Sequence, residues 1–141
     1  MEKLQFETGV KEYELNDGCI VHFNPCDPEF VERVYRVMDK LSNMQQEESP
    51  DTEDGDKVWE EINARDKAMR ETINSIFPFD GDVCEKAFPH VGVYALAGGL
   101  PLWTNLLLAI LDEVEKNLTD EQKKASPRVD YYKKKYGKYI K

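Results

Sequence analysis

The sequence has little of what catalytic and metal-binding sites usually need. Its 141 residues include two histidines and three cysteines, and these are too scattered to single out a nucleophile with an adjacent base. The chain also lacks the Gly-x-x-x-x-Gly-Lys pattern that cradles phosphates. We therefore expect no catalytic residue, no cofactor-binding residue and no metal ligand, and we expect a protein that is not an enzyme.

One weak metal-like pattern stands against this expectation. Cys19, His22 and Cys26 follow one another closely, and Cys84 or His90 would be the fourth ligand of a zinc site. If residues 19–23 form a strand, however, Cys19 and His22 point to opposite faces. Buried thiols and a strand histidine are the simpler interpretation, and a small enzyme or metal-binding protein stays as the alternative class.

Long apolar runs and an export signal are also missing. A membrane-spanning helix needs about 20 apolar residues, and the most apolar stretch is interrupted before it reaches that length. Residues 1–5 do not combine a basic region with a following apolar one, as a signal peptide would. Three cysteines without such a signal indicate reduced thiols. We expect no membrane partner and a location in the cytoplasm.

Charge is abundant but unevenly placed. The formal net charge is −9, yet residues 123–141 hold eight basic residues against the single acid Asp130, which gives +7 and leaves −16 for residues 1–122. A duplex-DNA-binding protein needs a basic main surface, so we expect no nucleic-acid partner for the body. An acidic body with a basic tail is typical of a protein that meets protein partners by charge.

The longest stretch without a charged residue, 87–111, is expected to form the centre of the core. Gly98 and Gly99 predict a tight turn that lets the next helix pack closely, and Pro101 predicts the first helical position. Apolar spacing predicts a helix over 102–118, covered on most sides. Its apolar residues are Leu102, Trp103, Leu106, Leu107, Ala109, Ile110, Leu111, Val114 and Leu118.

The chain before this stretch predicts a β start and then helices. Residues 4–23 alternate like two or three antiparallel strands, with Asp17-Gly18 as a two-residue hairpin turn. Asp27 and Pro28 predict the start of a helix over 28–46. An acidic linker over 47–56, a second helix over 57–77 and a short helix over 83–88 capped by Asp82 follow. The apolar stripes predicted for the two long helices are Phe30, Val31, Val34, Tyr35, Met38, Leu41 and Met44, and then Val58 or Trp59, Ile62, Met69, Ile73, Ile76 and Phe77.

The C-terminal part predicts a separate element. Thr119 and Gln122 have the spacing of a capping box, and a short turn or helix would end at Ser126-Pro127. The tail, residues 123–141, carries tyrosines at helical spacing among lysines, so we expect it to bind a protein partner, to dock on its own acidic body, or, less in keeping with the charge, to stack on single-stranded nucleic acid. The predicted partner-binding residues are Tyr132, Lys133, Lys134, Lys135, Tyr136 and Tyr139.

Together these patterns predict one domain over residues 1–141, of the α+β class and mostly α. A short N-terminal β-hairpin (1–24) precedes a helix (25–46), the acidic linker (47–56), a helical bundle-like body (57–122) and a basic C-terminal helix (123–141).

Three segments together support a family resemblance. They are VHFNPCDPEF at residues 21–30, VYALAGGLPLWTNLLLA at residues 93–109, and SPR at residues 126–128 with the Tyr/Lys tail. Over nearly its full length the chain resembles a family of small prophage and tailed-phage proteins of Gram-positive bacteria, usually encoded in the tail morphogenesis module. The order of its parts is similar to that of tail assembly chaperones.

The resemblance implies a non-enzymatic phage tail assembly chaperone in the cytoplasm of the bacterial host. Its partners would be other phage tail proteins, either the tape measure protein or the tail tube subunit. The alternative is a structural tail or connector component of the virion that forms a ring or another homo-oligomer. The resemblance brings no catalytic or ligand-binding residue.

Overall fold

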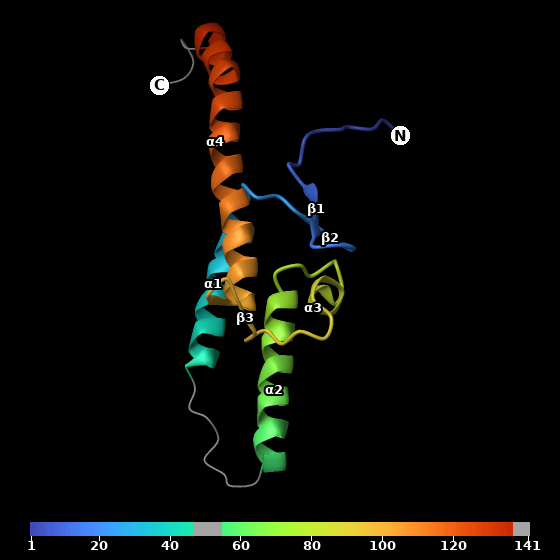
Figure 1. Ribbon diagram of the computed structural model, residues 1–141. Coiled ribbons are helices and arrows are strands. Elements are labelled where there is room, and N and C mark those ends of the chain that lie inside the picture. The colour runs from blue at the N-terminus through green and yellow to red at the C-terminus, as the bar shows by residue number, and fades with distance from the viewer. Residues whose placement is uncertain (47–54, 137–141) are drawn as a thin grey trace.

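The computed structural model describes residues 1–46 and 55–136, with side chains up to Lys123. Figure 1 shows a β-hairpin lying against a group of helices, in which α1 runs antiparallel to α2 and α4 and the last helix extends well beyond the others. The elements are β1 (Lys11–Leu15), β2 (Cys19–Phe23), α1 (Pro28–Gln45), α2 (Gly55–Asn74), α3 (Val83–Ala87), β3 (Leu96–Ala97), β4 (Leu100–Pro101) and α4 (Leu102–Tyr136). This architecture confirms the mostly α, α+β class.

The N-terminal hairpin has two strands. Residues 4–8 form no strand, so the third strand that the sequence pattern allowed is absent from this described part of the chain. Leu15 pairs with Cys19, so the turn contains three residues and not the predicted two. Asn16 takes a positive φ of 52° and Gly18 one of 101°, conformations that Asn and Gly tolerate best. Strand β2 buries Cys19 and its alternate neighbours and exposes the residues between them.

Helix α1 begins as predicted, because the Asp27 side chain accepts a hydrogen bond from the Glu29 N–H and Pro28 occupies the first turn. Its buried face contains Val37, which the predicted stripe omitted, whereas Tyr35 is 52% exposed. Apolar spacing alone does not decide which residues at the edges of the stripe are buried, because successive positions on a helix are rotated by about 100°.

Helix α2 ends at Asn74, earlier than predicted, and Ile76 and Phe77 enter the core from the turn that follows it. Its N-terminal half is exposed: Ile62 is 39% accessible, so the prediction that it belongs to the buried stripe is wrong. Of the two alternatives at the start of the stripe, Val58 is half-buried and Trp59 is 65% accessible. The short helix α3 is capped as predicted, with the Asp82 side chain accepting a hydrogen bond from the Glu85 N–H.

The apolar stretch 87–111 is only partly the core. Phe88 and Val93 are buried, but Leu96 and Leu100 are 74% and 40% exposed on the small β3–β4 hairpin. Gly98 and Gly99 form its turn with φ values of 63° and 86°. A Cβ on either glycine would meet nothing within 4 Å, so the turn is confirmed but the predicted close packing is wrong.

Helix α4 is one helix of 35 residues, about 52 Å long at 1.5 Å per residue. Pro101 pairs with Leu96 in β4 and precedes the helix. The predicted break is absent from the described backbone: Thr119 donates a hydrogen bond to the Glu115 carbonyl within the helix, and the helix continues past Pro127 to Tyr136.

One face of α4, rather than most of its circumference, is buried, through Trp103, Leu107, Ile110 and Val114. Leu108 is 42% exposed. Of the helices in the described ranges, none combines the length and apolarity required to cross a bilayer.

Candidate functional site

The predicted partner-binding residues fall on the part of α4 that leaves the body. Helix α4 contacts the hairpin through Glu113, which lies 3.5 Å from the Tyr13 hydroxyl, and through Asn117, whose Oδ1 lies 2.5 Å from Lys11 Nζ. Beyond Asn117 the helix runs for about 28 Å more and points away from the rest of the chain (Figure 1). We call residues 118–136 the distal α4 segment.

Five of the six predicted residues lie on this segment by backbone position. Tyr132, Lys133, Lys134, Lys135 and Tyr136 are within α4, and Tyr139 lies outside the described residues. Side chains are described as far as Lys123, so the role of the six stays a prediction. The helix does not turn back on the body over its described backbone, which disfavours docking of the tail on its own acidic surface.

Apolar side chains are exposed at the other end of the molecule. Within the stretch expected to offer apolar surface, Leu100 and Leu108 are 40% and 42% exposed. The first ten residues of α2, 55–64, are exposed apart from half-buried Val58, and they include Trp59 and Ile62. Exposed apolar residues grouped on one element are typical of interaction surfaces.

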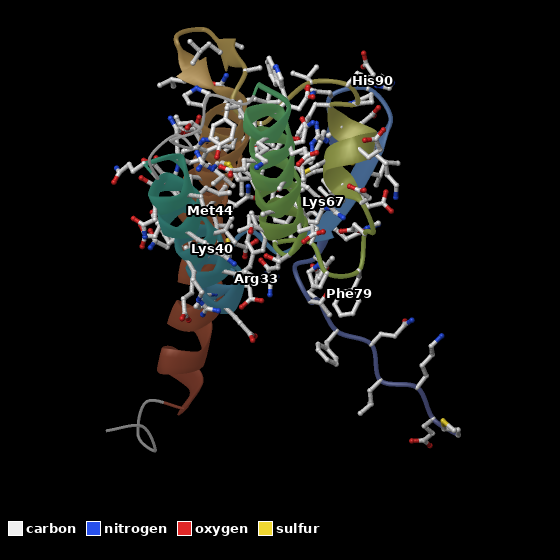
Figure 2. The ribbon with its side chains drawn as sticks, turned by 90° about the horizontal axis from the view of Figure 1, so that it is seen from below. Arg33, Lys40, Met44, Lys67, Phe79 and His90 are labelled. Carbon is white, nitrogen blue, oxygen red and sulfur yellow. The ribbon has the colours of Figure 1, made fainter. Side chains whose placement is uncertain are left out.

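A cavity of about 660 Å³ lies between the hairpin, the start of α1 and the turn after α2. His22 stands at its wall, with Nδ1 2.9 Å from Asp80 Oδ1 and Nε2 3.2 Å from Glu12 Oε1. The His22 backbone N–H also donates to Asp80. Figure 2 shows Arg33 and Phe79, both in the lining of the cavity, near each other at the edge of the molecule.

The two carboxylates decide what His22 can do. Hydrogen bonds to Asp80 first, and to Glu12 second, raise the pKa of His22 above its ordinary value of 6.5. Each ring nitrogen lies within hydrogen-bond distance of a carboxylate oxygen, and both can donate at once only in the protonated imidazolium form. In this form His22 bridges the hairpin and the α2–α3 turn.

The residues of the metal-like pattern are dispersed. Cys19 is fully buried and its Sγ lies 3.7 Å from the Val83 carbonyl, whereas His22 lies on the opposite, exposed face of β2. His90 lies far from the Phe79 turn in Figure 2. In residues 1–46 and 55–123, no three His, Cys, Asp or Glu side chains are grouped so that they could hold a metal ion.

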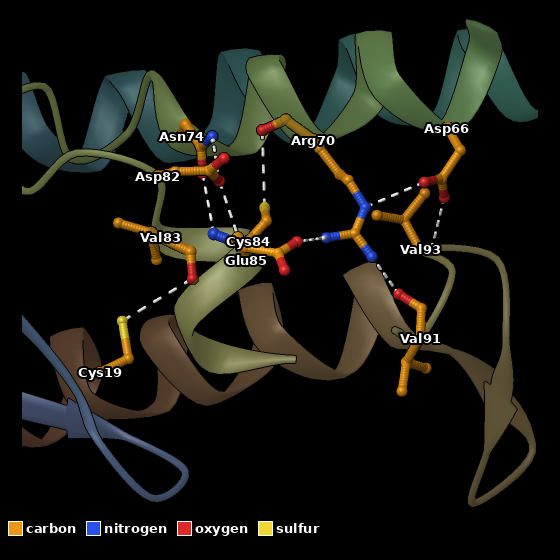
Figure 3. Close-up of polar contacts among 10 residues, drawn as sticks. All are labelled: Cys19, Asp66, Arg70, Asn74, Asp82, Val83, Cys84, Glu85, Val91 and Val93. Carbon is orange, nitrogen blue, oxygen red and sulfur yellow. Dashed lines mark hydrogen bonds and ion pairs between the residues drawn. The ribbon is translucent and has the colours of Figure 1, made fainter. Parts of the chain in front are cut away.

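A polar network joins α2 to the loops before α4 (Figure 3). Arg70 pairs with Asp66 at 2.9 Å, donates to the Val91 carbonyl and lies over the Phe88 ring at 5.0 Å. Asp66 in turn accepts from the Val93 N–H at 2.9 Å. This network fixes the path of residues 88–93 and so positions the start of α4.

Two buried cysteine thiols belong to the same region. Cys84 Sγ lies 3.5 Å from the Arg70 carbonyl, and burial raises the pKa of its thiol to about 12. Burial also raises the pKa of Cys19. The thiolate, which is the nucleophilic and metal-binding form, is therefore disfavoured at both positions.

Sequence reasoning missed Asp80 and the Asp66–Arg70 pair. Asp66 and Arg70 have the i, i+4 spacing of a helical ion pair, a signal that was available. The approach of Asp80 to His22 had no local signal, because the two residues are distant in the sequence. Comparisons with protein-family models, with curated proteins and with solved structures found no match to this chain.

Proposed function

We propose that this chain is a non-enzymatic protein of phage tail morphogenesis, of the tail assembly chaperone type, which binds tape measure or tail tube protein in the host cytoplasm. One structural feature carries the proposal: a single helix continues for about 28 Å beyond Asn117, which contacts the hairpin, and so holds its basic, tyrosine-containing end away from it. A segment held in this way reaches a partner without rearrangement of the core.

The chemistry of the segment fits protein binding. Tyrosine supplies a large contact area at a low cost in side-chain entropy, and lysines steer an acidic partner. The acidic body, with −16 over residues 1–122, keeps a protein with exposed apolar residues in solution. Exposed Leu100 and Leu108 supply apolar surface that an assembly factor would use to cover an unassembled subunit.

The test is a pull-down from prophage-induced cells with the full chain as bait. We expect recovery of tape measure or tail tube protein, and loss of that recovery for K133E/K134E/K135E. A matched control, K40E/K67E/K116E, reverses three exposed lysines outside the distal α4 segment and should retain the partner. Recovery of no tail protein by the unaltered chain would refute the proposal.

Mass analysis of purified virions separates the two versions of this function. An assembly factor is absent from the particle, whereas a ring-forming tail or connector component is present in stoichiometric amount. Deletion of residues 128–141 adds a check on the fold: circular dichroism should show an intact body, while association is lost.

A further inference from the structure

The N-terminal half of α2 presents an apolar face that nothing in the described chain covers. Trp59 is 65% and Ile62 39% exposed. Ile62 lies one i, i+7 step before Met69, which is fully buried together with Ile73, so the face is the continuation of the core-facing stripe of α2. We call residues 55–64 the α2 overhang.

The overhang is acidic as well as apolar. Glu60 and Glu61 directly precede Ile62 and are exposed, and residues 55–64 contain three acids against one lysine. A surface of this kind fits a partner that brings apolar side chains surrounded by positive charge.

The distal α4 segment has the complementary composition. Val129, Tyr132 and Tyr136 share one face of the helix by their i, i+3 and i+7 spacing, and Lys133, Lys134 and Lys135 lie among them in the sequence. The two segments are therefore complementary. Each has an apolar stripe, and the lysines of distal α4 are opposite in charge to the glutamates of the α2 overhang.

Within one chain these segments cannot meet. Figure 1 shows the C-terminal end of α4 and the first turn of α2 at opposite ends of the molecule, with the packed body between them. Helix α4 is continuous, so it cannot fold back without breaking. A second copy of the chain has no such restriction.

We propose that the α2 overhang is the docking site for the distal α4 segment of a second copy of this chain. The self-association rests on the partner-binding role proposed above for distal α4 and names one partner for it. Because the two surfaces differ, the contact is heterologous, and its repetition produces a closed ring or an open filament.

The size of the contact sets its strength. A pairing of about three helical turns buries less than the roughly 1,200 Å² of a standard stable interface. The association is therefore weak, dependent on concentration and weakened by salt, and tail proteins can compete for the same segment of α4.

The test uses analytical ultracentrifugation of the full chain over a concentration series. We expect E60K/E61K and K133E/K134E/K135E each to lower the association constant at least about tenfold. The variant that carries both sets of substitutions should restore the association constant, because the reversed charges on the two segments again attract. The control D112K/E115K makes the same change in net charge as E60K/E61K, at exposed positions of α4, and should associate like the unaltered chain.

Trp59 supplies a second readout. Trp59 is exposed whereas Trp103 is 7% exposed, so iodide quenches chiefly Trp59 fluorescence, and self-association should protect it. A monomer at every concentration, or failure of the combined variant to associate, would overturn the inference. Capture of tail protein by a chain that stays monomeric would leave the proposed function standing, whereas self-association without any tail partner would refute that function alone.

Discussion

Phe23 of β2 stacks on Phe30 of α1, with ring centroids 4.4 Å apart and planes inclined by 11°. Tyr13 stacks on the other side of Phe23 at 4.5 Å, and Phe77 tilts against both phenylalanines. This aromatic group joins the two-stranded hairpin to the helices. A hairpin alone is marginally stable in water, so its position depends on these rings.

Replacement of Phe30 by alanine should therefore lower the free energy of unfolding by about 3–5 kcal/mol, since the side chain is 1% exposed. Denaturant unfolding followed by circular dichroism measures the change. Tyr35→Ala on the same helix, at a position 52% exposed, is the control and should cost much less. Equal costs for the two variants would contradict the packing described.

The bridge formed by His22 should make stability depend on pH. The pKa of His22 is raised by Asp80 and Glu12, so protonation favours the folded state. Its contribution is fully present below the ordinary pKa of 6.5 and is lost as the pH rises through the elevated folded-state value. His22→Gln should remove this part of the pH dependence in unfolding experiments.

An NMR titration gives the direct measurement for the same residue. The His22 imidazole should titrate above 6.5 in the unaltered chain and lower in Asp80→Asn. An unchanged midpoint in that variant would show that Asp80 does not hold the proton on His22.

The Asp66–Arg70 pair should matter more than a surface pair of identical spacing. The Arg70 side chain is 18% exposed and also contacts Val91 and Phe88, so Arg70→Lys should cost about 1–3 kcal/mol. Arg36 pairs with Glu32 at the same i, i+4 spacing but is 71% exposed. Arg36→Lys should cost below about 0.5 kcal/mol, and a reversed order would contradict the network in Figure 3.

The three cysteines should differ in reactivity. Cys19 and Cys84 are buried and their pKa values are raised, to about 12 for Cys84. A thiol reagent at neutral pH should therefore modify the half-buried Cys26 first, and all three after unfolding. Rapid modification of Cys84 in the native protein, located by mass spectrometry of peptides, would show that α3 opens.

Continuity of α4 past Pro127 should appear as a distance. Spin labels at positions 116 and 130 should lie about 21 Å apart along one helix, measured in a Cys26→Ser background where the buried thiols stay unlabelled. Proline inside a helix removes one backbone hydrogen bond and favours a bend. A break at Ser126-Pro127 would give a distance distribution clearly different from that of Pro127→Ala.

Local signals predicted the parts of this fold that local chemistry determines. Asp27 with Pro28, and Asp82, cap their helices as expected, because a cap depends on residues within one turn. The alternation in 19–23 also placed Cys19 inside and His22 outside.

The errors concern contacts between distant residues. The helical period places Ile62 on the same face as Met69, but it cannot say how far along the helix that face is covered. The apolar run 87–111 could not reveal that Leu96 would sit on an exposed two-strand turn. The distal residues of α4 were identified by composition, and their separation from the body followed only from the continuous helix.

An unbroken α4 also fixes the rotation of its distal face relative to the core. The buried positions of Trp103, Leu107 and Val114 set the angular register of the helix, and each residue added beyond Asn117 turns everything after it by about 100°. A single-residue insertion there would move the tyrosines to another side of the axis. An insertion of seven would nearly preserve their direction while extending their reach by about 10 Å.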